Sequence, residues 1–211
     1  MCGIVGGVSN RDITSLLIEG LKRLEYRGYD SSGLAVLTKN NAFKRVRSVG
    51  KVDRLEKILT TRKNKIKGNI GIAHTRWATH GEPIEKNAHP HISNNTISVV
   101  HNGIIENYLE LKDSQLKQGY SFTSDTDSEV IAHAIEFAMQ SSDSFLESVQ
   151  KAITTFDGAY GLGIISPNYP NTIIATRKGS PLVIGIAKNG NYIASDQLAL
   201  LPVTNKFIFL E

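Results

Sequence analysis

The residue of this chain that is best suited to nucleophilic chemistry is Cys2, the only cysteine among 211 residues, which directly follows Met1. If Met1 is removed, the thiol of Cys2, with a reference pKa of about 8.5, stands next to an α-amine with a reference pKa of about 7.7–8.0. Such an amine is substantially neutral near physiological pH and can accept the thiol proton, so one residue supplies both nucleophile and base. The alternative is that Cys2 is a small buried apolar residue.

A thiol that attacks a carbonyl carbon also needs hydrogen-bond donors for the oxyanion that forms. The side-chain amide of Asn102 and the backbone N–H of Gly103 are suitable donors at the end of an expected strand, although Asn-Gly is also a common turn. Arg76 offers a planar fork for a substrate carboxylate. Asp127, expected in the first turn of a helix, would stay ionised and hold an ammonium group. Taken singly, Arg76 is better explained by a surface ion pair, and Asp127 by a charge that stabilises the helix.

The six histidines and the glycine-rich segments do not form a recognised cofactor motif. No histidine pair has the i, i+4 spacing with an intervening Glu that is typical of a zinc-protease helix. A single cysteine excludes both an internal disulfide and a thiolate metal cage. The glycine cluster at 158–163 lacks the lysine and the following helix of a phosphate-binding loop. We therefore expect neither a metal nor a cofactor.

The composition, with 40% hydrophobic and 21% charged residues, is that of an ordinary globular protein. No apolar stretch has the length of a membrane span. The opening MCGIVGGVSN lacks the basic start and the long apolar core of a signal peptide. These features predict a cytoplasmic protein that does not bind a membrane.

Positive charge is concentrated in residues 39–67, which hold eleven Lys or Arg against two acidic residues, a local balance of +9. A basic stretch can indicate a nucleic-acid partner or an acidic partner. Beyond Phe43 no aromatic residue interleaves with the basic ones, which argues against a platform for stacking bases. We interpret the stretch as the solvated surface of a hairpin and a helix, or as a contact to further domains, and we predict no nucleic-acid partner.

The elements that must position these residues follow from hydrophobic periodicity. The long stretch between Arg76 and Asn95 is expected to be irregular, and a loop of that length is usually functional. Thr126 and Glu129 fit a helix capping box. Helices are expected at 13–24, 51–62, 105–118, 127–140 and 143–155, and strands at 2–8, 33–38, 43–49, 68–75, 96–101, 158–166, 172–177, 182–187 and 191–195.

The order of strands, then helices, then strands, without strict alternation, predicts an α+β fold with mostly antiparallel sheets. Residues 1–211 are expected to form one domain. The chain stops in the apolar run FIFLE at 207–211. Because natural ends are usually polar, we expect this domain to be part of something longer.

Several motifs of the chain resemble the class II glutamine amidotransferases, which are of the N-terminal nucleophile (Ntn) type. The first motif, CGIVGG, marks only the superfamily, whereas RGYDS and HTRWATHG are similar to the fructose-6-phosphate branch. The resemblance covers essentially the whole chain. Its motifs are CGIVGG at 2–7, EYRGYDSSG at 25–33, HTRWATHG at 74–81, NAHPH at 87–91, VVHNGIIEN at 99–107, SDTDSE at 124–129, RKGSPLVIG at 177–185 and ASDQLALLPVT at 194–204.

The resemblance implies a four-layer αββα sandwich of the Ntn-hydrolase type and an enzyme that hydrolyses L-glutamine through Cys2. Asn102 and Gly103 would form the oxyanion hole, Arg76 would bind the α-carboxylate of glutamine, and Asp127 would bind its α-amine. The other residues implied at the site are the aromatic gate Trp77, the pocket backbone at Thr79 and His80, and the turn at Gly28.

The same resemblance implies partners. In that branch the glutaminase domain is followed by two sugar-isomerase domains, which bind fructose 6-phosphate and make glucosamine 6-phosphate from the ammonia. Residues 1–211 would be the glutaminase domain, and the full-length enzyme would be a homo-oligomer. Two alternatives stay open: a glutaminase domain that serves another acceptor, and a catalytically silent regulatory module that retains Met1.

Overall fold

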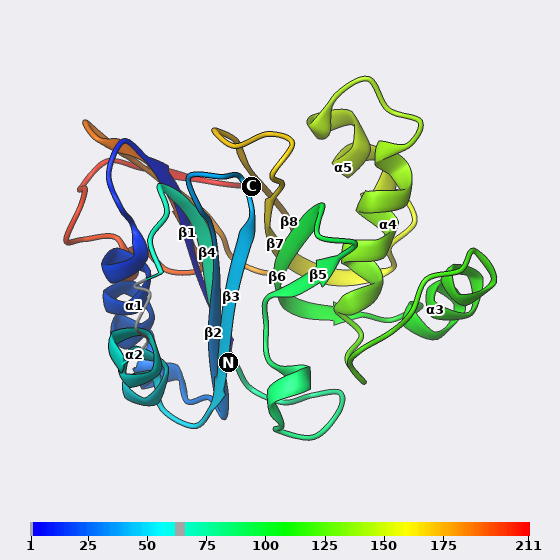
Figure 1. Ribbon diagram of the computed structural model, residues 1–211, viewed down its shortest axis with the longest axis horizontal. Helices are drawn as coiled ribbons and strands as arrows, with labels where there is room; N and C mark the ends of the chain where they lie inside the picture. Colours follow the sequence, from blue (N-terminus) through cyan, green and yellow to red (C-terminus); the bar gives the residue numbers. More distant parts are fainter. Residues whose placement is uncertain (1, 62–65) are drawn as a thin grey trace.

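The computed structural model describes residues 2–61 and 66–211 and has four layers, in the order helices, sheet, sheet, helices (Figure 1). Every strand pair in the described ranges is antiparallel. The predicted α+β class and the αββα layering are therefore confirmed. No helix in these ranges has the length and apolar character that crossing a membrane requires.

The larger sheet has seven strands in the order β11-β9-β10-β1-β4-β2-β3. Strand β1 pairs with β10 on one side and with β4 on the other, which anchors the chain directly after Cys2. Helices α1 (Thr14–Arg23) and α2 (Val52–Thr61) cover its outer face with buried leucines. The strands are β1 (Gly3–Ser9), β2 (Ser31–Leu37), β3 (Phe43–Val49), β4 (Ile70–Arg76), β9 (Val183–Ala187), β10 (Gly190–Ala194) and β11 (Phe207–Phe209).

The smaller sheet has four strands in the order β5-β6-β7-β8. Its strands are β5 (His91–Ser93), β6 (Ile97–Ile105), β7 (Gly158–Ile165) and β8 (Ile173–Lys178). Helices α4 (Glu129–Met139) and α5 (Phe145–Ile153) pack on its outer face, and α3 (Tyr108–Lys117) lies at the periphery (Figure 1).

The two sheets meet in an apolar layer that includes Ile4, Ile72, Val100 and Ile165, all fully buried. Burying one such side chain contributes about 1.5–3 kcal/mol, so this layer holds the sheets at a fixed spacing. Ile4 belongs to β1 and Val100 to β6, and both lie two residues from a candidate catalytic residue. The core therefore fixes the position of Cys2 relative to Asn102.

Most predicted elements are present, but several details differ. Strand β6, for example, runs to Ile105, past the predicted strand end at 101 and into the helix predicted at 105–118. The short strands β5 and β11 were not predicted. The capping box is wrong, because Glu129 accepts hydrogen bonds from the backbone of Thr123 and Ser124 instead. Asp127 lies just before α4 rather than in its first turn. The predicted helix over 51–62 and the basic stretch 39–67 extend into residues 62–65, which lie outside the described ranges.

Candidate active site

Cys2 lies at the start of β1, opposite the end of β4. The pairing of Gly3 with Thr75 brings Cys2 beside Trp77, whose backbone N–H donates to the Cys2 Sγ at 3.3 Å. Burial raises the pKa of the Cys2 thiol, while this hydrogen bond and the charge of Arg76 oppose the rise. The resting group is therefore a thiol, and a base must take its proton before it can attack.

Asn102 faces Cys2 from strand β6 of the other sheet. Its Nδ2 donates to the Cys2 carbonyl oxygen at 3.2 Å, and its Oδ1 lies 3.0 Å from His74 Nε2. His74 Nε2 also lies 2.8 Å from the carbonyl oxygen of His101. A carbonyl only accepts, so we assign the proton of neutral His74 to Nε2. The amide of Asn102 is thereby fixed with its NH₂ group toward Cys2.

His74 is a functional neighbour that sequence reasoning missed. Burial lowers its pKa to about 3, so the ring stays neutral and keeps one donor for the oxygen of Asn102. The strand register places it there, because His74 pairs with Ile4 in β1 and thus lies near the nucleophile. The sequence shows that His74 is in a strand but not what the ring touches.

Gly103 continues strand β6 and pairs with Tyr160 of β7, so Asn-Gly is not a turn here. Its φ is +133°, and a Cβ at this position would lie 2.0 Å from the carbonyl oxygen of Ala159. Only glycine fits such a close approach of two strands. The backbone around Gly103 can consequently stay next to Asn102 at the pocket.

Cys2, Asn102 and Gly103 line one pocket of about 410 Å³. Trp77 and Thr79 also line it. Its remaining walls were not predicted and come from Arg27, Ile104, Glu106, Ala159, Ser180 and Pro181. The pocket thus brings together a nucleophile, a side-chain amide and a strand backbone from both sheets.

Arg76 and Asp127 flank this pocket without belonging to its wall. Both are only 3% exposed. Arg76 donates to the carbonyl oxygens of Glu82 at 3.2 Å, Gly81 at 3.1 Å, and His80. Asp127 Oδ2 accepts from the backbone N–H of Ile105 at 2.9 Å.

The charged side chains of Arg76 and Asp127 interact electrostatically. Burial lowers the pKa of Arg76, and the nearby negative charges of Asp30 and Asp127 oppose that change. Arg76 is therefore close enough to the thiol and to Asp127 to interact electrostatically with both, and backbone groups hold each of the two charged side chains. Such a pair has the polarity that the two charged groups of an α-amino acid require.

The other predicted site residues surround Trp77. Its ring is 53% exposed and packs on Gly28, where φ is +72° and a Cβ would lie 2.6 Å from the ring. His80 does not line the pocket. Its carbonyl oxygen binds Arg76, and its ring lies edge-on to Tyr108 with 5.2 Å between the centroids.

Histidines gather behind the site. The ring of His89 lies 4.1 Å from that of His74 and 4.6 Å from that of His91, measured between centroids. Burial lowers the pKa of all three, so the rings are neutral. Over residues 2–61 and 66–211, no group of three or more His, Cys, Asp or Glu is arranged to hold a metal ion.

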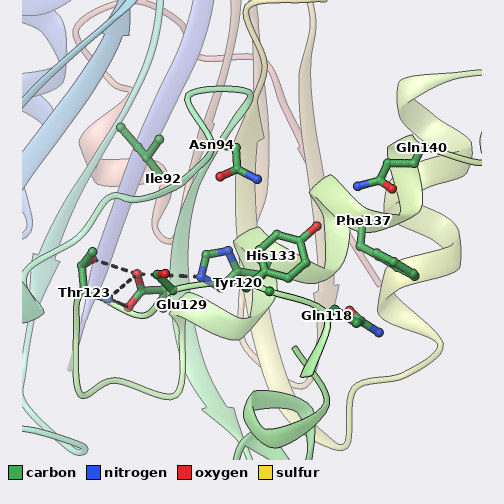
Figure 2. A pocket seen from close by; sticks show the side chains of 11 residues that line it. Ile92, Asn94, Gln118, Tyr120, Thr123, Glu129, His133, Phe137 and Gln140 are labelled. Atoms are coloured by element: carbon green, nitrogen blue, oxygen red, sulfur yellow. Dashed lines mark hydrogen bonds and ion pairs between the residues drawn. The ribbon is translucent and has the colours of Figure 1, made fainter. Parts of the chain in front are cut away.

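A second pocket, of about 400 Å³, lies beside α4 (Figure 2). Figure 2 shows Glu129 and His133 side by side, with the Glu129 carboxylate bound to Thr123. His133 Nδ1 lies 2.8 Å from Ser93 Oγ. The wall of this pocket contains no thiol, whereas Cys2 lines the other pocket.

Comparison with known proteins places this geometry in a family. A family model described as "Glutamine amidotransferase domain" matches residues 74–202. The glutamine--fructose-6-phosphate aminotransferases [isomerizing] of Photorhabdus laumondii and Acinetobacter baylyi are 58% and 57% identical to the whole chain, which covers 34% of each. The chain thus spans about a third of the length of the curated relatives it matches.

A solved structure has a similar fold. The glutamine phosphoribosylpyrophosphate amidotransferase of B. subtilis, complexed with ADP and GMP, has a TM-score of 0.80 at 25% identity. The match covers 99% of this chain and 44% of that one. The four-layer arrangement is therefore one that a glutamine amidotransferase adopts.

Proposed function

Because this chain belongs to the glutamine amidotransferase domain family, we propose that it hydrolyses L-glutamine to glutamate and ammonia with Cys2 as the nucleophile. The observation that carries the proposal is the meeting of Cys2, Asn102 and Gly103 in one pocket. A thiol, an oriented amide and a strand backbone are what acyl transfer from a carboxamide needs.

The first half-reaction forms a thioester. The α-amine of Cys2, free once Met1 is removed, takes the thiol proton, and Sγ attacks the side-chain amide carbon of glutamine. Met1 itself lies outside the described residues. The Asn102 NH₂ has two hydrogens, of which the Cys2 carbonyl oxygen engages one. The other hydrogen and the Gly103 N–H stabilise the oxyanion.

Collapse of the tetrahedral intermediate breaks the C–N bond. The protonated α-amine gives its proton to the leaving nitrogen, so ammonia departs and a γ-glutamyl thioester remains on Cys2. The neutral amine then takes a proton from water, and the hydroxide attacks the thioester. Glutamate leaves, and the proton returns to the thiol.

Arg76 and Asp127 bind the charged groups of glutamine in this proposal. Carbonyl oxygens of residues 80–82 accept three hydrogen bonds from Arg76, and Asp30 Oδ1 lies 4.0 Å from its Nη1, so the substrate carboxylate would use the N–H groups that these partners leave. Asp127 pairs with the α-ammonium group. The backbone at Thr79 and His80 and the turn at Gly28 complete the site, and Trp77 gates the exit of ammonia.

The names of the relatives support a role for this chain within a longer enzyme. They are glutamine--fructose-6-phosphate aminotransferases [isomerizing], of which the chain covers 34%. We infer that residues 1–211 are the glutaminase domain of such an enzyme. Its sugar-isomerase domains would use the ammonia to make glucosamine 6-phosphate from fructose 6-phosphate, in a cytoplasmic homo-oligomer.

The test is a glutaminase assay on the purified protein before and after alkylation with iodoacetamide. Because Cys2 is the only cysteine, alkylation reports on this thiol alone. We expect release of glutamate and ammonia, its loss after alkylation, and an intact mass that lacks one Met. Activity that survives complete alkylation would refute the mechanism. An inactive protein that retains Met1 would instead support the silent module.

A further inference from the structure

The buried side chain of Asn87, which ends the short 3₁₀ helix Glu85–Asn87, ties the segment between β4 and β5 to its surroundings. Asn87 is 0% exposed although it is polar. Its Nδ2 donates to the carbonyl oxygen of Glu82 at 3.0 Å and lies 3.3 Å from Asp125 Oδ2. Its Oδ1 accepts from the backbone N–H of Asp125 at 2.9 Å. Every polar atom of this side chain is thus used.

One end of this bridge reaches Arg76. The carbonyl oxygen of Glu82 accepts from both Asn87 and Arg76 Nη1, so the two side chains share one acceptor. Gly81, whose carbonyl also binds Arg76, has a φ of +76°. A Cβ there would lie 2.7 Å from Asn87 Nδ2. The backbone that holds the guanidinium is therefore packed directly against Asn87.

The other end of the bridge reaches Asp127. Asp125 precedes Asp127 by two residues, and Asp127 is in turn fixed by the backbone of Ile105. Asn87 therefore joins the loop that holds Arg76 to the segment that holds Asp127 from a buried position, and the exposed Lys86 adds an ion pair between its Nζ and Asp125 Oδ2 at 2.9 Å. No direct bond between the side chains of Arg76 and Asp127 does this in the described ranges.

The basic stretch contributes to the same arrangement. Arg47 Nη1 donates to the carbonyl oxygens of Lys86 at 2.9 Å and Ala88 at 3.1 Å, which flank Asn87. Arg45 Nη1 donates to the carbonyl oxygen of Pro90 at 3.2 Å. The expectation that this stretch is only solvated surface is wrong for these two arginines, because strand β3 uses them to hold residues 86–90.

We propose that Asn87 is a positioning residue, which sets the distance between Arg76 and Asp127 and thereby the recognition of the α-amino acid head group of glutamine. This proposal rests on the proposed function. Arg76 and Asp127 bind two groups on one carbon atom, so their separation must be correct within a narrow margin. Misplacement by about 1 Å can cost on the order of 10²-fold in rate. The thiol lies outside this network, because Trp77 and Asn102 hold Cys2.

The test replaces Asn87 with Ala. In L-glutamine hydrolysis we expect KM to rise by at least about tenfold while kcat changes by less than about threefold, because head-group binding is lost and the chemistry is kept. The rate of Cys2 alkylation by iodoacetamide without glutamine should stay within about twofold of the wild type. Arg76→Ala, which removes the proposed carboxylate ligand, gives the reference increase in KM.

The matched control is Asn107→Ala. Asn107 also bridges two backbone groups, donating to Thr155 O at 2.9 Å and accepting from Asp157 N–H at 3.1 Å, but it does so at the start of α3. We expect Asn107→Ala to lower the melting temperature without raising KM. If Asn87→Ala behaves the same way, or lowers kcat with KM unchanged, the positioning role is refuted.

A second variant covers the case in which Asn87→Ala fails to fold. Arg47→Met should raise KM in the same direction, whereas Arg54→Met, at an exposed arginine of α2, should not. Equal KM values in these two variants and the wild type would overturn the proposal. Arg47→Met and Arg54→Met each remove one positive charge, so the comparison between them is independent of net charge.

Protection of Cys2 from iodoacetamide by L-glutamine separates the two proposals. Protection of the wild type without turnover would overturn glutamine hydrolysis alone, and a loss of protection in Asn87→Ala would still support the positioning role. Equal protection of wild type and variant would overturn the positioning role alone. If the wild type shows neither turnover nor protection, both proposals are overturned.

Discussion

At the scale of single residues, the orientation of one amide decides what Asn102 can do. An Asn side chain presents either an oxygen or an NH₂ group, and an oxyanion requires the NH₂ group. His74 holds the Oδ1 of Asn102 at 3.0 Å, so Nδ2 faces Cys2. The neutral state of His74 contributes to this, because burial keeps the pKa of the ring far below neutral pH.

We predict that Asn102→Ala lowers kcat for L-glutamine by about 10²–10³-fold, the usual cost of one oxyanion donor, with KM near its wild-type value. Asn102→Asp keeps the shape of the side chain but has no NH₂ group, so it should lose a similar factor. Steady-state kinetics on variants with unchanged circular dichroism would check this. Full activity in either variant would remove Asn102 from the oxyanion hole.

At the scale of elements, the close pairing of β6 and β7 keeps the backbone of Gly103 at the pocket. The strands approach so closely that the Ala159 carbonyl oxygen occupies the place of a side chain. β7 cannot retreat without losing its hydrogen bonds to β6 and β8. The glycine is thus required both by its φ of +133° and by the space available.

We predict that Gly103→Ala lowers the free energy of unfolding by more than about 3 kcal/mol, since a backbone clash adds to the cost of positive φ. Gly50 is the matched control, with a φ of +94° and no atom within 4 Å of its would-be Cβ. Gly50→Ala should cost about 1–2 kcal/mol from φ alone. Urea unfolding measures both. Equal losses would mean that strands β6 and β7 can separate at Gly103 at little cost.

At the scale of the whole molecule, the buried histidines link folding to pH. Burial lowers the folded-state pKa of His74 to about 3 and also lowers the pKa values of His89, His91, His101 and His133. In the unfolded chain a histidine has a pKa of about 6.5. Below that pH the unfolded chain binds more protons than the folded one, so acid favours unfolding.

We predict a free energy of unfolding that is nearly constant above about pH 7.5 and falls steadily from pH 7 to 5.5. Each such histidine contributes a slope of up to about 1.4 kcal/mol per pH unit once the pH lies well below 6.5. Urea unfolding at several pH values gives this slope. It should persist in 0.5 M NaCl, because salt screens buried groups much less than surface charges. A flat profile over this range would contradict the neutral histidine cluster.

How much of the fold could be predicted depended on the length of the pattern. The predictions were correct to within a few residues for helices α1, α4 and α5 and for most strands. The helical periodicity extends over two turns or more, and the strands are apolar or alternating runs of sufficient length. Strands β5 and β11 have three residues each, which is too short for a repeat. The predicted start of α4 was two residues too early. The chain before the helix folds back so that the backbone N–H groups of Thr123 and Ser124 donate to the Glu129 carboxylate, and no local sequence pattern reveals this.

The sequence by itself determined the chemistry available to this protein: one cysteine beside Met1, an Asn-Gly pair on a strand, and an arginine and an aspartate with the polarity of an amino acid's partners. These follow from residue types and short spacings. The tertiary structure decided which groups meet, namely Asn102 with His74 and Cys2, and Asn87 with Glu82 and Asp125. The reason is that strand register and sheet stacking depend on contacts between segments far apart in the sequence, such as Ile4 and Ser195, 191 residues apart, which only the packed core fixes.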